Sequence, residues 1–192
     1  MHPVPASLVS KGSLELPDLD VGVGRVFCLH VPYNFPGAIA DLKPRLASTV
    51  KKKGSKVVVS SPAYDTRWFR RFRREETPID WLIRNARVSK IKAEISIRNL
   101  QRADIQASKP LSHHPGTPRA LLGICAALEM HPDVLIYSTE ALDLSGTMDV
   151  HNLVSRHGDN LCAVHISLPH FHGDGKPAER ICPSKGECLD LA

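Results

Sequence analysis

The chain of 192 residues is long enough for one domain with a sizeable core, and its mixture of 42% hydrophobic and 23% charged residues excludes a disordered chain. No apolar run approaches the length that crosses a bilayer, and residues 1–20 lack the basic start and apolar core of a secretory signal. The five cysteines are widely spread. These features predict a cytoplasmic protein that does not span the membrane.

Short apolar runs alternate along the chain with longer segments of helical periodicity. The runs predict strands at 25–31, 56–61, 133–137 and 160–168, and the periodic segments predict helices at 38–50, at 78–105 in two pieces, at 118–130 and at 146–156. Pro44 counts against the first helix, because proline removes a backbone donor. Residues 179–191 predict a hairpin around a Pro-Ser-Lys-Gly turn. Strands that alternate with helices indicate an α/β domain with a mostly parallel sheet.

The net charge of +5 conceals an uneven distribution, because residues 43–102 hold 17 Lys/Arg against 5 Asp/Glu and the remainder has a balance of −7. Trp68, Phe69 and Phe72 lie among the arginines. Guanidinium groups with aromatic neighbours suit nucleic acid, since phosphates take the charge and bases stack. The segment predicts a face for an anionic polymer, either nucleic acid or polysaccharide; docking of an acidic protein and a solvated surface are the alternatives. The proposed residues are Lys51, Lys52, Lys53, Arg67, Arg70, Arg71, Arg73 and Arg74.

The order of the pieces resembles that of an ABC-transporter ATPase domain. The stretch PGTPRALLGICAALEMHPDVLIYSTEALDLSG (115–146) has an Arg-containing helix ending in Ala-Leu, an x-Pro turn, an apolar strand and a loop ending in Leu-Asp, as in the second half of that family. VHISLPHF looks like the next strand, and AERICPSKGECLDL looks like the terminal hairpin. The resemblance implies one domain over 1–192 with a P-loop NTPase-like, three-layer fold and a small helical subdomain at roughly 75–130.

Upstream, RVFCLHV and VPYNFPGAIADL stand where the family has its phosphate loop and the helix that follows it. Such a loop needs glycines whose N–H groups converge on phosphate, a lysine that reaches it, and a hydroxyl for magnesium. The resemblance places these three functions on Pro36, Gly37 and Ala38. Gly37 has no amine to reach phosphate, Ala38 has no hydroxyl for magnesium, and Pro36 has no backbone N–H to donate.

The acidic residues at the end of the Walker B strand are replaced as well. The resemblance places the family's aspartate on Ser138 and the adjacent glutamate on Thr139, although Glu140 lies one residue further on. The signature loop corresponds to 114–118, which keeps one glycine. Fixed charges and a metal ion provide most of the catalysis in phosphoryl transfer. The sequence therefore predicts a pseudo-ATPase with no catalytic residue and no cofactor, in which even ATP with magnesium is doubtful.

Three functional hypotheses follow from the sequence. The first is a non-hydrolysing binding or regulatory subunit of an export-related assembly, whose partner is an ABC-type subunit, a membrane component or a second copy of the chain. Such a partner would hold the protein peripherally at the inner membrane. The second is a protein that binds an anionic polymer through the basic segment. The third is a divergent active ATPase that uses Glu140 and a displaced lysine such as Lys43.

A metal site is weighed and set aside at this stage. His170-x-His172 with Cys182 and Cys188 could in principle hold zinc. The spacing matches no regular zinc finger, and the two cysteines lie on opposite sides of the predicted turn. The sequence alone therefore predicts no metal ligand.

The remaining thiols are interpreted as buried core residues. Cys28 or Cys162 beside His30 or His165 is a conceivable catalytic Cys–His pair. Neighbours along a strand point to opposite faces, however, which argues against such a pair.

Overall fold

The computed structural model describes residues 16, 19–32, 38–51, 55–64, 75–140, 142–167, 182–183 and 186–191, with only the backbone at 38–40 and 51. Five strands form one sheet in the order β2-β3-β4-β1-β5, and every pair of neighbours is parallel. The strands are β1 (Val26–His30), β2 (Val57–Val59), β3 (Val134–Ser138), β4 (Cys162–Ser167) and β5 (Glu187–Asp190). The predicted α/β fold with a mostly parallel sheet is confirmed.

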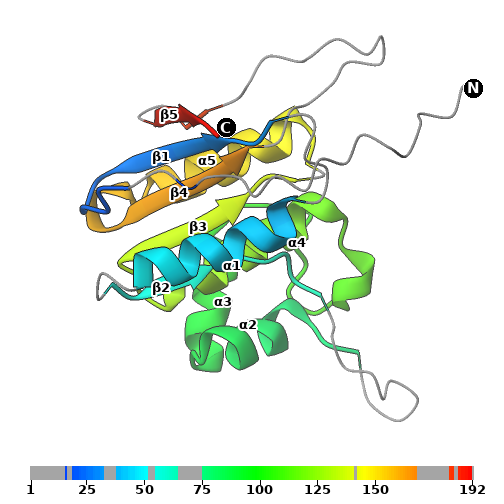
Figure 1. Ribbon diagram of the computed structural model, residues 1–192. Coiled ribbons are helices and arrows are strands. Elements are labelled where there is room, and N and C mark those ends of the chain that lie inside the picture. Colours follow the sequence, from blue (N-terminus) through cyan, green and yellow to red (C-terminus); the bar gives the residue numbers. More distant parts are fainter. Residues whose placement is uncertain are drawn as a thin grey trace, which may run out of the picture.

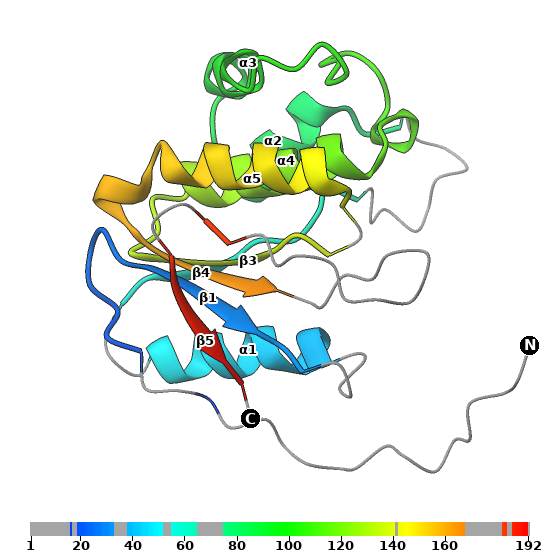
Figure 2. The same ribbon diagram turned by 90° about the horizontal axis from the view of Figure 1, so that it is seen from above.

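Helices cover both faces of this sheet (Figures 1 and 2). Among the described residues, one face carries α1, and the other carries α4 and α5, with α2 and α3 packed outside α4 (Figure 2). The helices are α1 (Ala38–Lys51), α2 (Pro78–Ala86), α3 (Lys90–Asn99), α4 (Gly116–Glu129) and α5 (Leu144–Ser155), with 3-10 turns η2 (Leu111–His113) and η3 (Gly158–Asn160). No helix among the described residues is both long and apolar enough to span a membrane.

The α1 helix forms despite its internal proline. Leu42, Leu46 and Val50 recur every four residues, and all three are buried against the sheet, whereas Pro44 is exposed. Burying each of these apolar side chains contributes about 1.5–3 kcal/mol, which together outweighs the roughly 3 kcal/mol that an interior proline costs. Tertiary packing therefore overrides the local penalty that the sequence suggested.

Side chains alternate strictly between the two faces of the sheet. Phe27 and Leu29 of β1 and Ile136 of β3 join the core beneath α1. Leu135 of β3 and Ala163 of β4 join the core beneath α4 and α5. The strands β1, β3 and β4 are thus buried on both sides, which explains why they appear in the sequence as continuous apolar runs.

The α4 helix lies between the sheet and the outer helices, and ten of its fourteen residues are buried. At Gly123 the backbone of the segment after β2 passes so close that an added Cβ would overlap the carbonyl oxygen of Ser61. Glycine is required here for close approach, since no larger side chain fits.

The outer helix α2 is anchored at its first turn. Thr77 and Asp80 form a reciprocal capping box, and Pro78 follows at the first helical position. The preceding Glu76 is 1% exposed and receives two hydrogen bonds from Arg84, both at 2.8 Å. The backbone N–H of Leu111 also donates to the Glu76 carbonyl at 2.8 Å, which ties α2 to the segment before α4. A division into a core and a helical subdomain at roughly 75–130 stays a prediction.

We expect Gly123→Ala to lower the free energy of unfolding by about 2–3 kcal/mol, because the new methyl group must displace backbone. An exposed helical Gly→Ala exchange would instead stabilise the protein by up to about 1 kcal/mol. Gly158→Ala is the matched control, since nothing lies within 4 Å of a Cβ built there. Urea unfolding followed by circular dichroism measures both variants. Equal midpoints for Gly123→Ala and Gly158→Ala would contradict the close approach.

Candidate functional site

Three strand ends define the candidate site. In open α/β sheets, ligands bind beyond the carboxyl ends of parallel strands. β1 and β3 flank β4 in parallel, so their carboxyl ends lie at the same edge of the sheet. The phosphate-loop positions Pro36 and Gly37 fall between β1 and α1 but lie outside the described residues, and Ala38 is described only as the first residue of α1.

The end of β3 carries the predicted Walker B positions. Ser138 is half-buried, Thr139 is 3% exposed, and Glu140 is exposed. The hydroxyl of Thr139 shares a hydrogen bond with Nε2 of His165 on β4 at 3.1 Å. The Thr139 side chain therefore belongs to the interior of the protein, and only Glu140 faces solvent.

His165 lies at the centre of a polar row that crosses the sheet. In register, Cys188 of β5 lies beside Cys28 of β1, Cys28 beside His165, and His165 beside Tyr137 of β3. Cys28 Sγ is 3.3 Å from His165 Nδ1, and the His165 ring stacks on the Tyr137 ring at 5.0 Å. His151 of α5 completes the cluster, with its Nδ1 3.0 Å from the Tyr137 hydroxyl. A connected polar network is therefore buried between the sheet and α5.

Burial keeps the acidic members of this network protonated. It raises the pKa of the Tyr137 phenol well above its usual value, and nearby Cys28 and Cys182 raise it further. Burial also raises the pKa of the Cys28 thiol far above its usual range, and a hydrogen bond with Cys182 adds to the effect. A thiol with a raised pKa is a poor nucleophile. Cys28 therefore pairs with a histidine without being activated for catalysis.

The prediction that strand alternation keeps the cysteines and histidines apart is wrong for Cys28. Cys28 and His30 are two residues apart, so their side chains share one face of β1. Cys28 also meets His165 across the adjacent strand, which no spacing along the chain reveals. The signal available was the placement of reactive side chains at alternate positions, Cys28-x-His30 and His165-x-Ser167. By contrast, Cys162 points into the core beneath α1.

Lys43 and Glu140 interact at the same edge of the sheet. Burial lowers the pKa of the half-buried Lys43 ammonium, and the negative charge of Glu140 partly offsets that decrease. These are the two residues that the hypothesis of a divergent ATPase requires.

The similarity of this chain to known proteins lies in its fold and not in its sequence. No family model and no curated protein matches this sequence. Among solved structures, a metal-chelate type ABC transporter in an inward-facing conformation matches with a TM-score of 0.57 and 14% identity, over 77% of this chain and 64% of that chain. A dimeric ATP-binding cassette in a post-hydrolysis state, bound to ADP and Pi, matches with a TM-score of 0.55 and 12% identity, over 85% of this chain and 87% of that chain. The chain has the fold of an ABC-transporter ATPase domain.

The predicted basic face of this ABC ATPase-like domain lies almost wholly outside the described residues. Lys52, Lys53 and all five arginines between 67 and 74 fall there, and Lys51 is described only as the last residue of α1. Binding of an anionic polymer by this segment stays a prediction.

The signature-loop positions of the ABC ATPase-like domain serve a structural role. His114 is buried, with Nδ1 2.9 Å from the carbonyl oxygen of Pro110, and its Nε2 accepts a hydrogen bond from the N–H of Gln106 at 3.1 Å. Both ring nitrogens thus hold the segment that leads into α4. The helix itself begins at Gly116.

The cysteines considered for zinc lie closer together than the sequence suggested. Cys182 and Cys188 do lie on two sides of a turn, closed by a hydrogen bond from the Gly186 N–H to the Pro183 carbonyl at 2.9 Å. That turn brings their sulfur atoms to 2.9 Å rather than keeping them apart. His170 and His172 lie outside the described residues.

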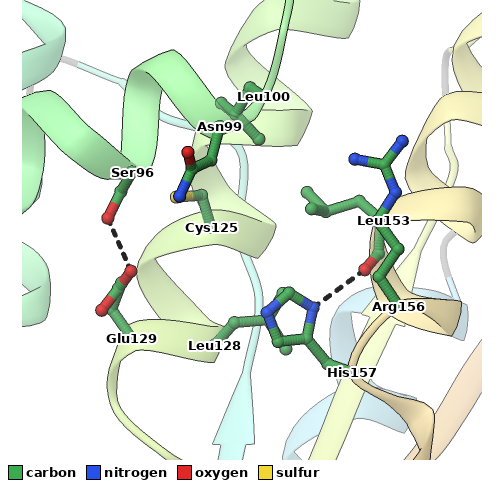
Figure 3. Close-up of a pocket in the computed structure, with 9 residues that line it drawn as sticks. All are labelled: Ser96, Asn99, Leu100, Cys125, Leu128, Glu129, Leu153, Arg156 and His157. Atoms are coloured by element: carbon green, nitrogen blue, oxygen red, sulfur yellow. Dashed lines mark hydrogen bonds between the residues drawn. The ribbon is translucent and has the colours of Figure 1, made fainter.

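A separate pocket of about 140 Å³ lies between α3, α4 and the end of α5 (Figure 3). Its carboxylate, Glu129, accepts a hydrogen bond from Ser96 Oγ at 2.6 Å and pairs with Lys92 at 3.3 Å. The His157 ring bonds to a backbone carbonyl of α5. Burial raises the pKa of the Cys125 thiol to about 12. The side chains of Ser96, Glu129 and His157 in this pocket are already engaged, and we assign it no catalytic role.

We expect Thr139→Val to lower the free energy of unfolding by about 1–2 kcal/mol, because it removes a hydrogen bond from a buried ring while keeping the volume. Thr49→Val is the matched control. Thr49 is exposed on α1, where its hydroxyl bonds to the Arg45 carbonyl at 3.1 Å. The control should change stability by less than about 0.5 kcal/mol. Thermal unfolding measures both variants. Equal shifts in their melting temperatures would show that the Thr139–His165 bond is not part of the folded core.

Proposed function

We propose that this ABC ATPase-like domain does not hydrolyse ATP and acts by binding a protein partner. The end of β3 is the observation that carries the proposal. Ser138 and Thr139 occupy the positions that the resemblance assigns to an aspartate and a glutamate, and neither side chain supplies a negative charge. Phosphoryl transfer needs fixed charges that hold a metal ion and orient water. Without them, most of the catalysis is lost.

The burial of Thr139, at the position that the resemblance assigns to a glutamate, also supports the proposal. A glutamate at this position would have to place its carboxylate against the His165 ring, where the present side chain is 3% exposed. Desolvating an ionised carboxylate is costly unless it gains a paired charge. The packing is thus adapted to a neutral side chain at this position.

Lys43 and Glu140 support the alternative of a divergent but active ATPase. Their charges interact at the correct edge of the sheet. Lys43 lies six residues after Gly37, the position that the resemblance assigns to the phosphate-binding lysine, which displaces it by about 9 Å along a helix. We therefore rank this alternative below the pseudo-ATPase.

The proposed partner is an ABC-type subunit, a membrane component of an exporter or a second copy of the chain. One of the similar solved structures is dimeric and another is a transporter, which makes association a reasonable expectation for this fold. In this proposal the domain resides in the cytoplasm and is held at the membrane through its partner. The ABC fold supplies the docking surface while the nucleotide site has lost its charged groups.

A second candidate function is the binding of an anionic polymer by the segment 43–102. Its balance of +12, against −7 for the rest of the chain, is the observation that favours it. Basic side chains that neutralise phosphates release counterions, so the binding should weaken steeply with salt.

For the pseudo-ATPase we expect no Mg-ATP turnover above background and no binding at millimolar nucleotide. Isothermal calorimetry and a phosphate-release assay on the full chain measure both. Micromolar binding of Mg-ATP would contradict the loss of the phosphate site.

Glu140→Gln and Lys43→Ala test whether these two residues carry any residual turnover. If turnover persists in both variants, the divergent-ATPase hypothesis in which these two residues act is wrong. Turnover that Glu140→Gln abolishes, while the control Glu94→Gln on exposed α3 retains it, would establish the divergent ATPase.

For the basic segment we expect heparin and single-stranded RNA to bind with a salt-dependent affinity. Replacing Arg70, Arg71 and Arg73 with glutamine should reduce the slope of log affinity against log salt by about 2. The control removes three positive charges outside the segment, at Lys11, Lys109 and Arg156, and should leave the slope nearly unchanged. Fluorescence anisotropy at several salt concentrations gives the slopes. Equal decreases in the slope for the two variants would mean that binding depends only on net charge. If the protein is not retained on heparin at low salt, this function is excluded.

A further inference from the structure

Four metal-binding side chains converge where β5 joins the sheet. They are Cys28 and His30 of β1, Cys188 of β5 and Cys182 before the turn, and one donor atom from each lies within 4.8 Å of all the others. We propose that Cys28, His30, Cys182 and Cys188 form a tetrahedral zinc site. This inference is independent of whether the domain binds or hydrolyses ATP.

The distances fit a tetrahedral ion. With Zn–S of about 2.3 Å and Zn–N of about 2.0 Å, the edges of a tetrahedron are about 3.5 Å from sulfur to nitrogen and about 3.8 Å between sulfurs. Cys182 Sγ lies 3.5 Å from His30 Nε2, which matches the first edge. The Cys182–Cys188 distance of 2.9 Å is shorter than the second edge. Rotation of the exposed Cys188 side chain can open it, since Cys188 lies on the edge strand.

The fold places these ligands without help from the metal. Cys28 and His30 share a face of β1 because they are two residues apart. Parallel pairing puts Cys188 directly beside Cys28. The turn from Pro183 to Gly186 then returns Cys182 to the same point. A Cβ added at Gly186 would lie 3.2 Å from the Pro183 carbonyl oxygen, so glycine allows this turn to stay tight.

The chemistry of the donor set selects zinc. Thiolates and imidazole suit Zn²⁺, and a Cys₃His set fills all four positions of a structural site. Cys28 and His30 are buried, Cys182 is half-buried and Cys188 is exposed, so an ion can enter from the side of Cys188. With every position filled by protein, the site has no open coordination position for catalysis.

An outer hydrogen bond also orients one ligand. His165 Nδ1 lies 3.3 Å from Cys28 Sγ, and its Nε2 bonds to Thr139 at 3.1 Å. Outer-shell groups of this kind fix the orientation of metal ligands. The polar network of the sheet therefore continues into the proposed site.

A disulfide between Cys182 and Cys188 is the competing use of these thiols. It would engage two of the four groups and would not account for the convergence of Cys28 and His30 on the same point. Zinc engages all four, and it also explains how β5 stays on the sheet. Most residues of β5 are exposed, so apolar burial contributes little there, and a metal bond to β1 would fix this strand.

The test measures metal on the full chain, expressed with added zinc and purified with reductant and without a histidine tag. Mass spectrometry of the elements should find one zinc per chain. Cobalt substitution should give the visible absorption of a tetrahedral ion together with thiolate charge-transfer bands. Folded, reduced protein that takes up no stoichiometric metal at micromolar zinc would overturn the proposal, as would a Cys182–Cys188 disulfide whose reduction restores no zinc binding.

Cys188→Ser tests the ligand set, because Cys188 is exposed and its loss should leave the fold intact by circular dichroism. Zinc affinity should fall by more than about tenfold, since losing a ligand costs more than losing an outer-shell partner. Cys125→Ser is the control, because Cys125 lies in α4 away from the cluster. Equal affinity in the two variants would overturn the assignment. If Cys188→Ser does not fold, removal of zinc from the wild-type protein with a chelator tests the ligand set instead. Chelation must then accelerate the alkylation of Cys182 and Cys188, while the alkylation of Cys125 stays slow.

Discussion

The position of β1 between two parallel neighbours is the constraint on which the other features depend. Its register with β4 and β5 sets Cys28 beside both His165 and Cys188. Strand alternation directs Phe27 and Leu29 into the apolar core beneath α1, so the reactive side chains must lie on the other face. A shift of one residue in this strand would exchange the two faces and break both the core and the polar network.

The polar network explains how the carboxyl end of β3 is stabilised in this ABC ATPase-like fold. Buried polar groups are tolerated when each finds a hydrogen-bond partner, and a well-satisfied network makes a core more specific. Tyr137 bonds to His151, His165 bonds to Thr139, and the rings of His165 and Tyr137 stack. The end of β3 is thereby stabilised by neutral side chains. An active site there would instead require carboxylates that reach solvent and a metal ion.

The likeness to ABC ATPase domains rests on layers and connections rather than on motifs, with identities of 14% and 12% to the two solved structures. Folds tolerate such divergence because alternating burial, helix packing and parallel pairing can be met by many sequences. Functional sites tolerate far fewer sequence changes, because their chemistry depends on particular atoms. The same fold can therefore be kept while the residues of a site change.

The sequence by itself determined the α/β class, the parallel sheet and most helices, because the apolar runs and helical periods are local and strong. It also identified Ser138, Thr139 and Glu140 as the end of the third strand. It predicted the helix at 38–50 in spite of Pro44, whose cost is outweighed by burial of Leu42 and its neighbours. Only the tertiary structure brought Cys28, His30, Cys182 and Cys188 together, since strand order and register unite residues more than 150 positions apart. Contacts of that kind depend on pairing between strands, which leaves no period or spacing in the chain.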